Sequence, residues 1–267
     1  MRERQYQVNA IVLKRTDVGE ADRLLTLLTA ERGKLRAVAK GARKPNARKT
    51  GHVELFNAVA LSLHVAREID IVTQAQTREP FLAMRDDLDR LGYAYYFAEL
   101  IDRFVQEEIE QREIYDLMFN ALHWLETTTH LARTARYFQV RLLDALGYRP
   151  QLQFCIQSKT ELLPQENFFS PEGGGMLKPE YRSMYRDAIA VPVNALKVLR
   201  YLQSRTYAEI EQLNLSPQVE SEVEALLHYY ITHLLERNLK SVDFLNTLKH
   251  SVPIVSNHKG FARKSQS

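Results

Sequence analysis

The chain has 267 residues, of which 45% are hydrophobic and 26% are charged. This composition is ordinary for a globular protein and suffices for one large domain or about two to three small ones. No stretch approaches the roughly 18 consecutive apolar residues of a membrane helix, and the first residues lack the apolar region of a secretory signal. Cys155 is the only cysteine, which excludes an internal disulfide. We therefore expect a cytoplasmic protein that does not associate with membranes.

The positive charge is concentrated near the N-terminus, although the formal net charge is only +3. Residues 1–50 contain 13 Lys and Arg against 5 Asp and Glu, a local net charge of +8. The remaining residues therefore carry a net charge of −5. Such an asymmetry indicates a localised site for a polyanion, and it concerns binding rather than the fold.

The first eighty residues have the pattern of short strands separated by turn residues such as Gly19 and Gly33. The expected strands cover residues 7–14, 23–29, 34–40, 53–65 and 68–74. The third alternates with period two, so one face carries Leu35, Ala37 and Ala39 and the other carries Lys34, Arg36, Val38 and Lys40. About five short strands in a segment of this length predict a small closed barrel, and we favour the OB type.

The pattern becomes helical near Pro80. Helices are expected over residues 82–105, 114–125, 129–146, 193–203 and 217–239. In the first of them, apolar residues at helical spacing predict a core face of Leu88, Leu91, Tyr95, Ala98, Ile101 and Val105. The third helix is expected to end at Gly147, before Pro150.

Together these patterns predict an α+β multidomain protein. A five-stranded OB-type barrel would occupy residues 1–80, and an all-helical domain would occupy 81–150 and 188–248. Prolines and three consecutive glycines predict an irregular insert over 151–187. The last segment, 249–267, is basic and poor in apolar residues, which predicts a disordered tail.

The clearest candidate site is the cationic stretch between Lys34 and Val53, which contains no acidic residue. Alternate cations on a strand that runs into a cationic loop would face the phosphates of a nucleic acid, and such binding weakens as salt rises. The candidate DNA-binding residues are Arg15, Lys34, Arg36, Lys40, Arg43, Lys44, Arg48 and Lys49. The alternative is a solvated charge run that prevents association between strand edges.

Three aromatic or imidazole side chains in the barrel region are candidates for stacking on bases: Tyr6, Phe56 and His64. For each of them, a place in the core or on an ordinary surface is the favoured interpretation.

No motif for bond chemistry is present. The histidines form no HxxxH or HxH pair, and GxSxG, phosphate-binding and dinucleotide-binding signatures are missing. Cys155, Ser158, Lys178 and Tyr181 have the spacing of a zinc ribbon, but only Cys155 can ligate zinc. We therefore expect no enzyme, no cofactor and no metal, with Cys155 as a small buried residue.

A second candidate site lies on the helix that starts near Arg133. Arg133, Arg136, Tyr137 and Arg141 recur at three- and four-residue spacing and form a mixed basic and aromatic stripe. A short acidic peptide with a hydrophobic end would fit such a stripe, because arginine pairs with carboxylates. In the alternative interpretation, Tyr137 belongs to the core and the arginines only balance nearby acids such as Asp102, Glu108 or Asp144.

Several segments resemble the bacterial RecO family. Residues 10–15, 19–23 and 29–43 are similar to the opening of its members, and residues 141–150, Cys155 and 169–174 resemble the central part. The resemblance implies an OB barrel and a helical domain with a zinc-ribbon-like insert. In members with a zinc site, cysteines stand where this chain has Ser158, Lys178 and Tyr181, so metal dependence is not implied here.

The same resemblance implies a function. Members bind single- and double-stranded DNA, anneal complementary strands, and interact with RecR and with the C-terminal tail of single-strand binding protein. In this way they help to load RecA onto coated single strands. The tail is acidic and ends in Phe, which matches the stripe around Arg136 and Tyr137. Two rivals stay open, namely an RNA-binding barrel and a non-catalytic scaffold whose basic loop binds an acidic protein.

Overall fold

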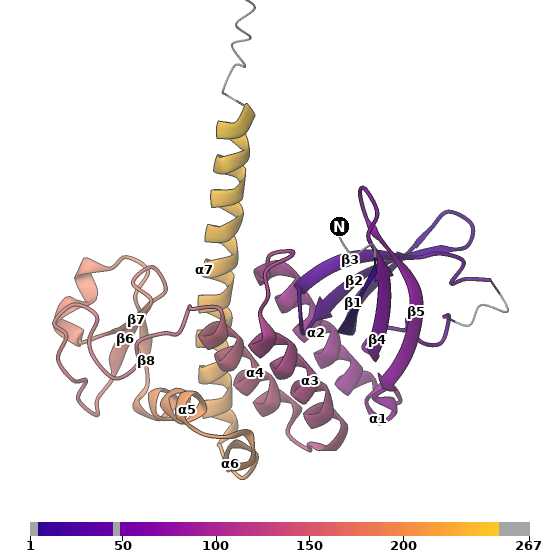
Figure 1. Ribbon diagram of the computed structural model, residues 1–267. Helices are drawn as coiled ribbons and strands as arrows, with labels where there is room; N and C mark the ends of the chain where they lie inside the picture. Colours follow the sequence, from indigo (N-terminus) through magenta and orange to yellow (C-terminus); the bar gives the residue numbers. More distant parts are fainter. Residues whose placement is uncertain (1–4, 45–48, 251–267) are drawn as a thin grey trace, which may run out of the picture.

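The computed structural model describes residues 5–44 and 49–250 and places a β-barrel beside a helical body (Figure 1). The strands of the barrel are β1 (Gln5–Val18), β2 (Asp22–Thr29), β3 (Gly33–Ala39), β4 (Ala58–His64) and β5 (Asp70–Glu79). Their order is β1-β2-β3-β5-β4, and β1 also pairs with β4, so the sheet closes on itself. The predicted five-stranded OB-type barrel is therefore confirmed.

Strand β1 is buried on both of its faces. Ala10 and Val12 lie in the barrel interior, whereas Ile11 and Leu13 belong to the core of the helical body. Because neighbouring side chains of a strand point in opposite directions, one continuous apolar run serves both cores. The barrel is thus fixed to the helices through the outer face of β1.

The fourth strand begins later than expected. Residues 53–57, predicted to open it, form a turn in which Phe56 has a φ of 62° and is fully buried. The amide of Phe56 donates to the carbonyl of Val12 at 2.8 Å. Burial of this aromatic ring therefore overrides the strand propensity of the segment. Strand β5, in contrast, continues to Glu79 instead of ending at Gln74.

The helical body contains seven α-helices in the described residues. They are α1 (Leu82–Arg85), α2 (Leu88–Phe104), α3 (Arg112–Thr127), α4 (Leu131–Ala145), α5 (Val193–Ser204), α6 (Tyr207–Glu211) and α7 (Pro217–His250). The sequence predicted neither the short helix α6 nor the full length of α7, which extends beyond the rest of the body (Figure 1). None of these helices combines the length and the hydropathy needed to span a bilayer.

The single helix expected over residues 82–105 is two helices. Helix α1 ends at Arg85, and Asp87 caps α2, since its carboxylate accepts from the amides of Asp89 at 2.9 Å and Arg90 at 3.2 Å. The predicted core positions Leu88 and Tyr95 are wrong, because 85% and 49% of their surfaces are exposed. Helix α2 instead buries a stripe of Ala94, Phe97, Ala98, Leu100, Ile101 and Phe104.

The segment expected to be irregular contains a small antiparallel sheet. Its strands are β6 (Asn167–Ser170), β7 (Gly175–Leu177) and β8 (Ile189–Val191), and they lie in the order β7-β6-β8. A 3-10 helix, η1 (Pro179–Met184), connects β7 to β8 along the chain. This unit lies on the side of the helical body opposite the barrel (Figure 1). The predicted disordered tail lies outside the described residues from position 251 onward.

Candidate nucleic-acid interface

Three segments meet at one end of the barrel. The turn between β1 and β2, the end of β3 and the loop after it lie together, because antiparallel neighbours place alternate turns at the same end. The amide of Gly41 donates to the Asp22 carboxylate at 2.8 Å, and the amide of Arg43 donates to the Ala21 carbonyl at 2.9 Å. Gly41 has a φ of +67°, which favours glycine where the chain leaves β3. We call Lys40, Arg43 and Lys44 the basic rim.

The loop that follows β3 completes the barrel wall. Strands β3 and β5 pair at only two positions, Ala37↔Asp70 and Val38↔Ile71, so most of β5 has no strand on that side. The loop fills this gap, because Ala42 and Val53 both lie fully buried in the barrel interior.

Polar contacts hold the second half of the loop against the barrel. The hydroxyl of Thr50 donates to the Ala42 carbonyl at 2.6 Å, and the ammonium group of Lys49 donates to the Val72 carbonyl at 2.6 Å. The predicted phosphate ligand Lys49 therefore already bonds to β5.

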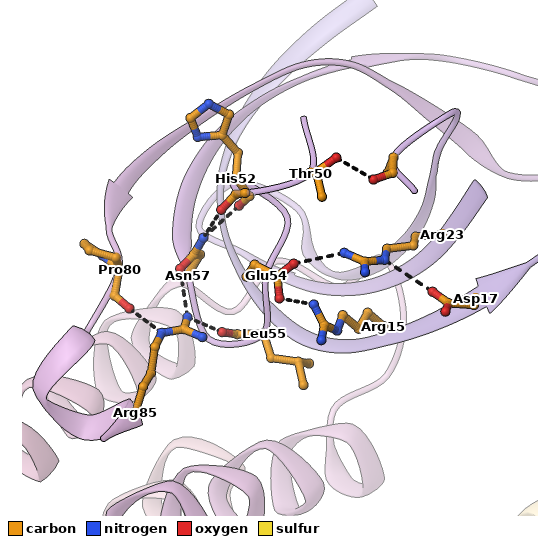
Figure 2. Close-up of polar contacts among 12 residues, drawn as sticks. Arg15, Asp17, Arg23, Thr50, His52, Glu54, Leu55, Asn57, Pro80 and Arg85 are labelled. Atoms are coloured by element: carbon orange, nitrogen blue, oxygen red, sulfur yellow. Dashed lines mark hydrogen bonds and ion pairs between the residues drawn. The ribbon is translucent and has the colours of Figure 1, made fainter. Parts of the chain in front are cut away.

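Behind the rim lies a cluster of alternating charges, which Figure 2 shows as a chain of ion pairs. The carboxylate of Glu54 binds Arg15 and also Arg23, the latter at 3.0 Å. Asp17 contacts Arg23 at 3.2 Å and Arg43 at 3.4 Å. Two carboxylates therefore accompany three arginines, and this reduces the positive potential at this end of the barrel without cancelling it.

The sequence analysis did not name Arg23, Asp17 or Glu54 as site residues. A signal for one pair was available, because Asp17 and Arg23 are direct cross-strand partners in the hairpin around Gly19. Glu54 is more than thirty residues away from Arg15 and Arg23 in the chain, so only the folded structure reveals that they are in contact.

Arg85 of α1 connects the loop between β3 and β4 to the helical body. Its guanidinium donates to the Pro80 carbonyl at 2.7 Å, to the Asn57 side chain at 2.8 Å and to the Leu55 carbonyl (Figure 2). Burial, with a smaller contribution from Arg15, lowers the pKa of Arg85 from its ordinary value. The loop is therefore held by the barrel, through Lys49, and by the helical body, through Arg85.

Two of the predicted DNA-binding residues lie away from the rim. The prediction that Lys34 is displayed to solvent is wrong: it is 7% exposed and its ammonium lies 3.2 Å from the Asp102 carboxylate of α2. Arg36 is exposed but pairs with Glu107 at 3.1 Å. Strand alternation correctly directed both side chains out of the barrel, but the helical body covers that side.

The rim itself is accessible. Lys40 and Lys44 are exposed, and within residues 5–44 and 49–250 neither forms an ion pair. Arg43 is exposed; its guanidinium donates to the Gly19 carbonyl at 3.2 Å and pairs with Asp17, an exposed ion pair of the kind that contributes about 0.2–1 kcal/mol. A phosphate can therefore replace that partner at little cost. Arg48 lies outside the described residues, and Arg15 is held by Glu54.

The structure offers no freely exposed ring among the three stacking candidates. Phe56 is fully buried, which confirms the favoured core interpretation and excludes it as a platform for bases. The hydroxyl of Tyr6 donates to Asp70 at 2.5 Å, and the guanidinium of Arg32 lies 3.7 Å from the centre of its ring. Burial and the neighbouring Asp70 carboxylate raise the pKa of Tyr6 above its ordinary value. His64 is half-buried at the end of β4.

The stripe on α4 is divided between two sets of partners. Arg133 is 6% exposed, donates to the Glu211 carbonyl at 3.1 Å and lies 3.4 Å from Glu220; Arg136 binds Glu224 at 2.9 Å. Both therefore face the start of α7.

Tyr137 and Arg141 have other partners and line a different depression of the surface. Tyr137 is 6% exposed and packs edge-on against Trp124, as the core interpretation expected. Arg141 lies over the Tyr137 ring and donates to the carbonyls of Gln203 at 3.2 Å and Arg205 at 2.6 Å. The four predicted residues thus do not form one continuous surface.

A pocket of about 180 Å³ opens beside Arg133 and Arg136. Its apolar walls are formed by Ala132, Val198, Leu202, Leu215, Pro217 and Val223, and its acidic residues are Glu220 and Glu224. The Nε atom of Arg133 is buried and has no hydrogen-bond partner among the described residues. A small site with an apolar wall and a guanidinium is suited to a carboxylate that carries an apolar group.

The position of Cys155 does not fit a zinc site. The thiol is fully buried and accepts a hydrogen bond from the Lys178 amide at 3.5 Å. Ser158 shares a hydrogen bond with Thr160 at 2.8 Å, and the ammonium of Lys178 donates to the same Thr160 hydroxyl at 2.6 Å. Burial raises the pKa of Cys155, but hydrogen bonds from Ser158 and from backbone amides outweigh it and lower the pKa overall. Among the described residues, no three potential His, Cys, Asp or Glu ligands gather.

Comparison with known proteins gives a consistent match over both parts of the chain. The family model described as Recombination protein O N terminal matches residues 1–81, and the one described as Recombination protein O C terminal matches residues 85–243. A protein of Roseiflexus sp. (strain RS-1) named DNA repair protein RecO is 43% identical over 93% of this chain and 88% of its own length. Proteins of the same name from Dehalococcoides mccartyi (strain ATCC BAA-2266 / KCTC 15142 / 195) and Desulforamulus reducens are each 36% identical over 92% of this chain and 97% and 96% of their own lengths.

Proposed function

The chain belongs to the RecO family of DNA repair proteins, and from this premise we propose that it is a DNA-binding mediator of recombinational repair. In this proposal it binds single- and double-stranded DNA, promotes annealing of complementary strands and helps to load RecA onto coated single strands. It performs no bond chemistry of its own and acts in the cytoplasm.

The observation that carries the DNA-binding part is the basic rim. Lys40, Arg43 and Lys44 project from one end of the barrel, and the two lysines have no carboxylate partner in the described part of the chain. Neutralising phosphates at this end releases counterions and reduces the repulsion between two strands that approach each other. Annealing then needs no chemical step, since base pairing itself provides the driving force.

The pocket beside Arg133 and Arg136 supports the second part of the proposal. An acidic tail that ends in Phe would place its ring against the apolar wall and its carboxylates near the two guanidinium groups. Single-strand binding protein would in this way bring the protein to coated DNA. RecR is the further proposed partner, and RecA is reached only indirectly.

The experiment is a salt series of fluorescence anisotropy with labelled single-stranded DNA. The variant Lys40→Glu/Arg43→Glu/Lys44→Glu should bind at least about tenfold more weakly at low salt, and each lost phosphate contact should reduce the slope of log K against log salt by about 0.7. The matched control is Arg103→Glu/Arg112→Glu/Arg149→Glu, which changes three exposed arginines of the helical body. Unchanged binding and slope in the rim variant would contradict the proposal, as would equal loss in the control.

The same titration separates the rivals. Matched RNA and DNA oligonucleotides should compete with each other through their phosphates, whereas an acidic peptide should not displace DNA from the rim. Tighter binding of RNA would favour an RNA-binding protein, and displacement by the peptide would favour a protein scaffold.

A further inference from the structure

The outer face of the barrel carries a polar groove that the rim does not include. A cavity of about 880 Å³ runs across β1, β4 and β5, which lie side by side in Figure 1. The strand register aligns its floor into two cross-strand rows: Gln7, Ser62 and Gln74 in one, and Asn9, Ala60 and Gln76 in the other. The small side chains of Ala60 and Ser62 lie in the middle of these rows and leave the space that the amides surround.

The charges at the two ends of the groove differ. Lys49, His52 and Arg78 line one end, next to the loop that carries the basic rim. Glu31 lines the other end, where its carboxylate accepts from the backbone amide of Asn9 at 3.0 Å and from its side chain at 2.8 Å. A polyanion would therefore enter from the loop side and stop before Glu31.

The floor of the groove provides neutral donors and acceptors. Side-chain amides and hydroxyls bind phosphate and sugar oxygens, and such contacts position a nucleic-acid backbone without reading its sequence. No Phe, Tyr or Trp side chain lines this groove in the described part of the chain. The imidazole of His52, at one end, accepts a hydrogen bond from the Thr77 amide at 3.2 Å, and the nearest ring on β1, Tyr6, is covered by Arg32. A strand in the groove would thus be held by its backbone rather than by stacking of its bases.

We infer that the groove across β1, β4 and β5 is the track of a single DNA strand that continues from the basic rim, and that it leaves the bases free to pair. This inference rests on the proposed function, because it assumes that the rim binds DNA. It identifies a physical basis for annealing: a strand stacked on aromatic rings must first be released, whereas a strand held through its backbone can pair where it lies.

The first test measures single-stranded DNA binding by anisotropy in the variant Gln74→Glu/Gln76→Glu. Both side chains are exposed on β5, so the fold should persist, and this is checked by thermal unfolding. The two new negative charges should weaken binding about tenfold. The matched control Gln106→Glu/Gln153→Glu makes the same change at exposed amides outside the groove and should weaken binding less than about twofold.

The second test compares an ordinary oligonucleotide with one of equal length that lacks its bases. The two should bind within about threefold, because the contacts are to the backbone; a loss of about fivefold or more per removed base would indicate stacking and overturn the inference. If the groove variant keeps its DNA affinity while the rim variant loses it, the groove inference fails and the proposed function stands. If the rim variant also keeps its affinity, the proposed function itself fails. If the groove variant loses affinity for a partner protein but not for DNA, the groove is a protein interface and the inference is wrong.

Discussion

Lys34 of β3 and Asp102 of α2 form an ion pair of 3.2 Å that joins the barrel to the helical body. The lysine is 7% exposed, and its ammonium also donates to the Asp102 carbonyl. Its charge is therefore used within the fold and is not available to a phosphate. This pair makes Lys34 a structural residue, distinct from the basic rim after β3 that we propose binds DNA.

We expect Lys34→Met to destabilise the protein by about 1–3 kcal/mol, because Asp102 loses its partner and the site loses hydrogen bonds to an ammonium. DNA affinity should not change. The measurement is the free energy of unfolding in urea together with anisotropy. The crossed control is Lys40→Met on the exposed rim, which should keep stability within about 0.5 kcal/mol and lose DNA affinity. The opposite outcome for the two variants would show that their roles are exchanged.

The ion pairs behind the rim predict a gain of affinity. Asp17 contacts both Arg23 and Arg43, and Arg23 also keeps Glu54. Asp17→Asn should therefore free Arg43 of its carboxylate partner, remove one negative charge beside the rim and strengthen single-stranded DNA binding about two- to fivefold at low salt. The gain should disappear at high salt, where these interactions are screened. Asp116→Asn removes the partner of Arg112 on α3 and is the control, with no expected change. Weaker binding by Asp17→Asn would show that Asp17 orients the arginines instead of competing with DNA.

The pocket on α4 predicts competition between a bound tail and the protein's own carboxylates. Because Glu224 lies 2.9 Å from Arg136, Glu224→Gln should free the guanidinium and bind an acidic peptide ending in Phe about threefold more tightly. Arg136→Ala should abolish most of that binding. Isothermal titration of both variants is compared with Glu222→Gln, which makes the same charge change on α7 where the glutamate contacts only Gln218. If Glu222→Gln increased the peptide affinity equally, the gain would come from the change in net charge and not from release of Arg136.

The N-cap of α2 predicts a contribution to stability that depends on pH. Hydrogen bonds from the Arg90 amide, and further ones from Asp89 and the Arg90 side chain, lower the pKa of Asp87 below its ordinary value, although partial desolvation opposes them. A carboxyl whose pKa is lower in the folded state stabilises the protein above the unfolded pKa of about 3.9, and this stabilisation is lost as pH falls through the folded pKa.

The variant Asp87→Ser keeps a hydroxyl that can cap the helix but has no charge. The difference in unfolding free energy between the two proteins should therefore be constant near neutral pH and shrink as the pH falls below the ordinary range of aspartate. Urea unfolding across this range measures it. A difference that grows in acid would contradict the assigned sign.

The surroundings of Cys155 predict that the small sheet needs no metal. A chelator should leave the melting temperature within about 1 °C, since Lys178, Thr160 and Ser158 bond to one another where a metal would have to bind. Differential scanning fluorimetry with and without chelator provides the measurement. A drop of several degrees would mean that the chain binds a metal through ligands other than this group.

The sequence pattern predicted the architecture well and the individual contacts less well. Alternation in β3 correctly buried Leu35, Ala37 and Ala39, because this periodicity depends only on strand geometry. It could not distinguish Lys34 from Lys40, since the helix that covers Lys34 lies about seventy residues away in the chain. On α2 and its C-cap the predicted positions Ala98, Ile101 and Val105 are buried, whereas Leu88 in the first turn and Tyr95 are exposed. On α4, spacing placed Tyr137 and Arg136 together, whereas packing against two different helices separated them.

The loop between Ala42 and Val53 has a consequence for how this family can vary. Both of its ends contribute a buried residue to the barrel wall, so the segment that carries the proposed DNA-binding rim is also part of the seam that closes the sheet. Insertions between Ala42 and Val53 would change the length and the charge of the loop without opening the barrel. Replacing Ala42 or Val53 would instead open the barrel between β3 and β5. A loss of DNA binding in such a variant would then reflect a disrupted barrel and not a lost DNA contact.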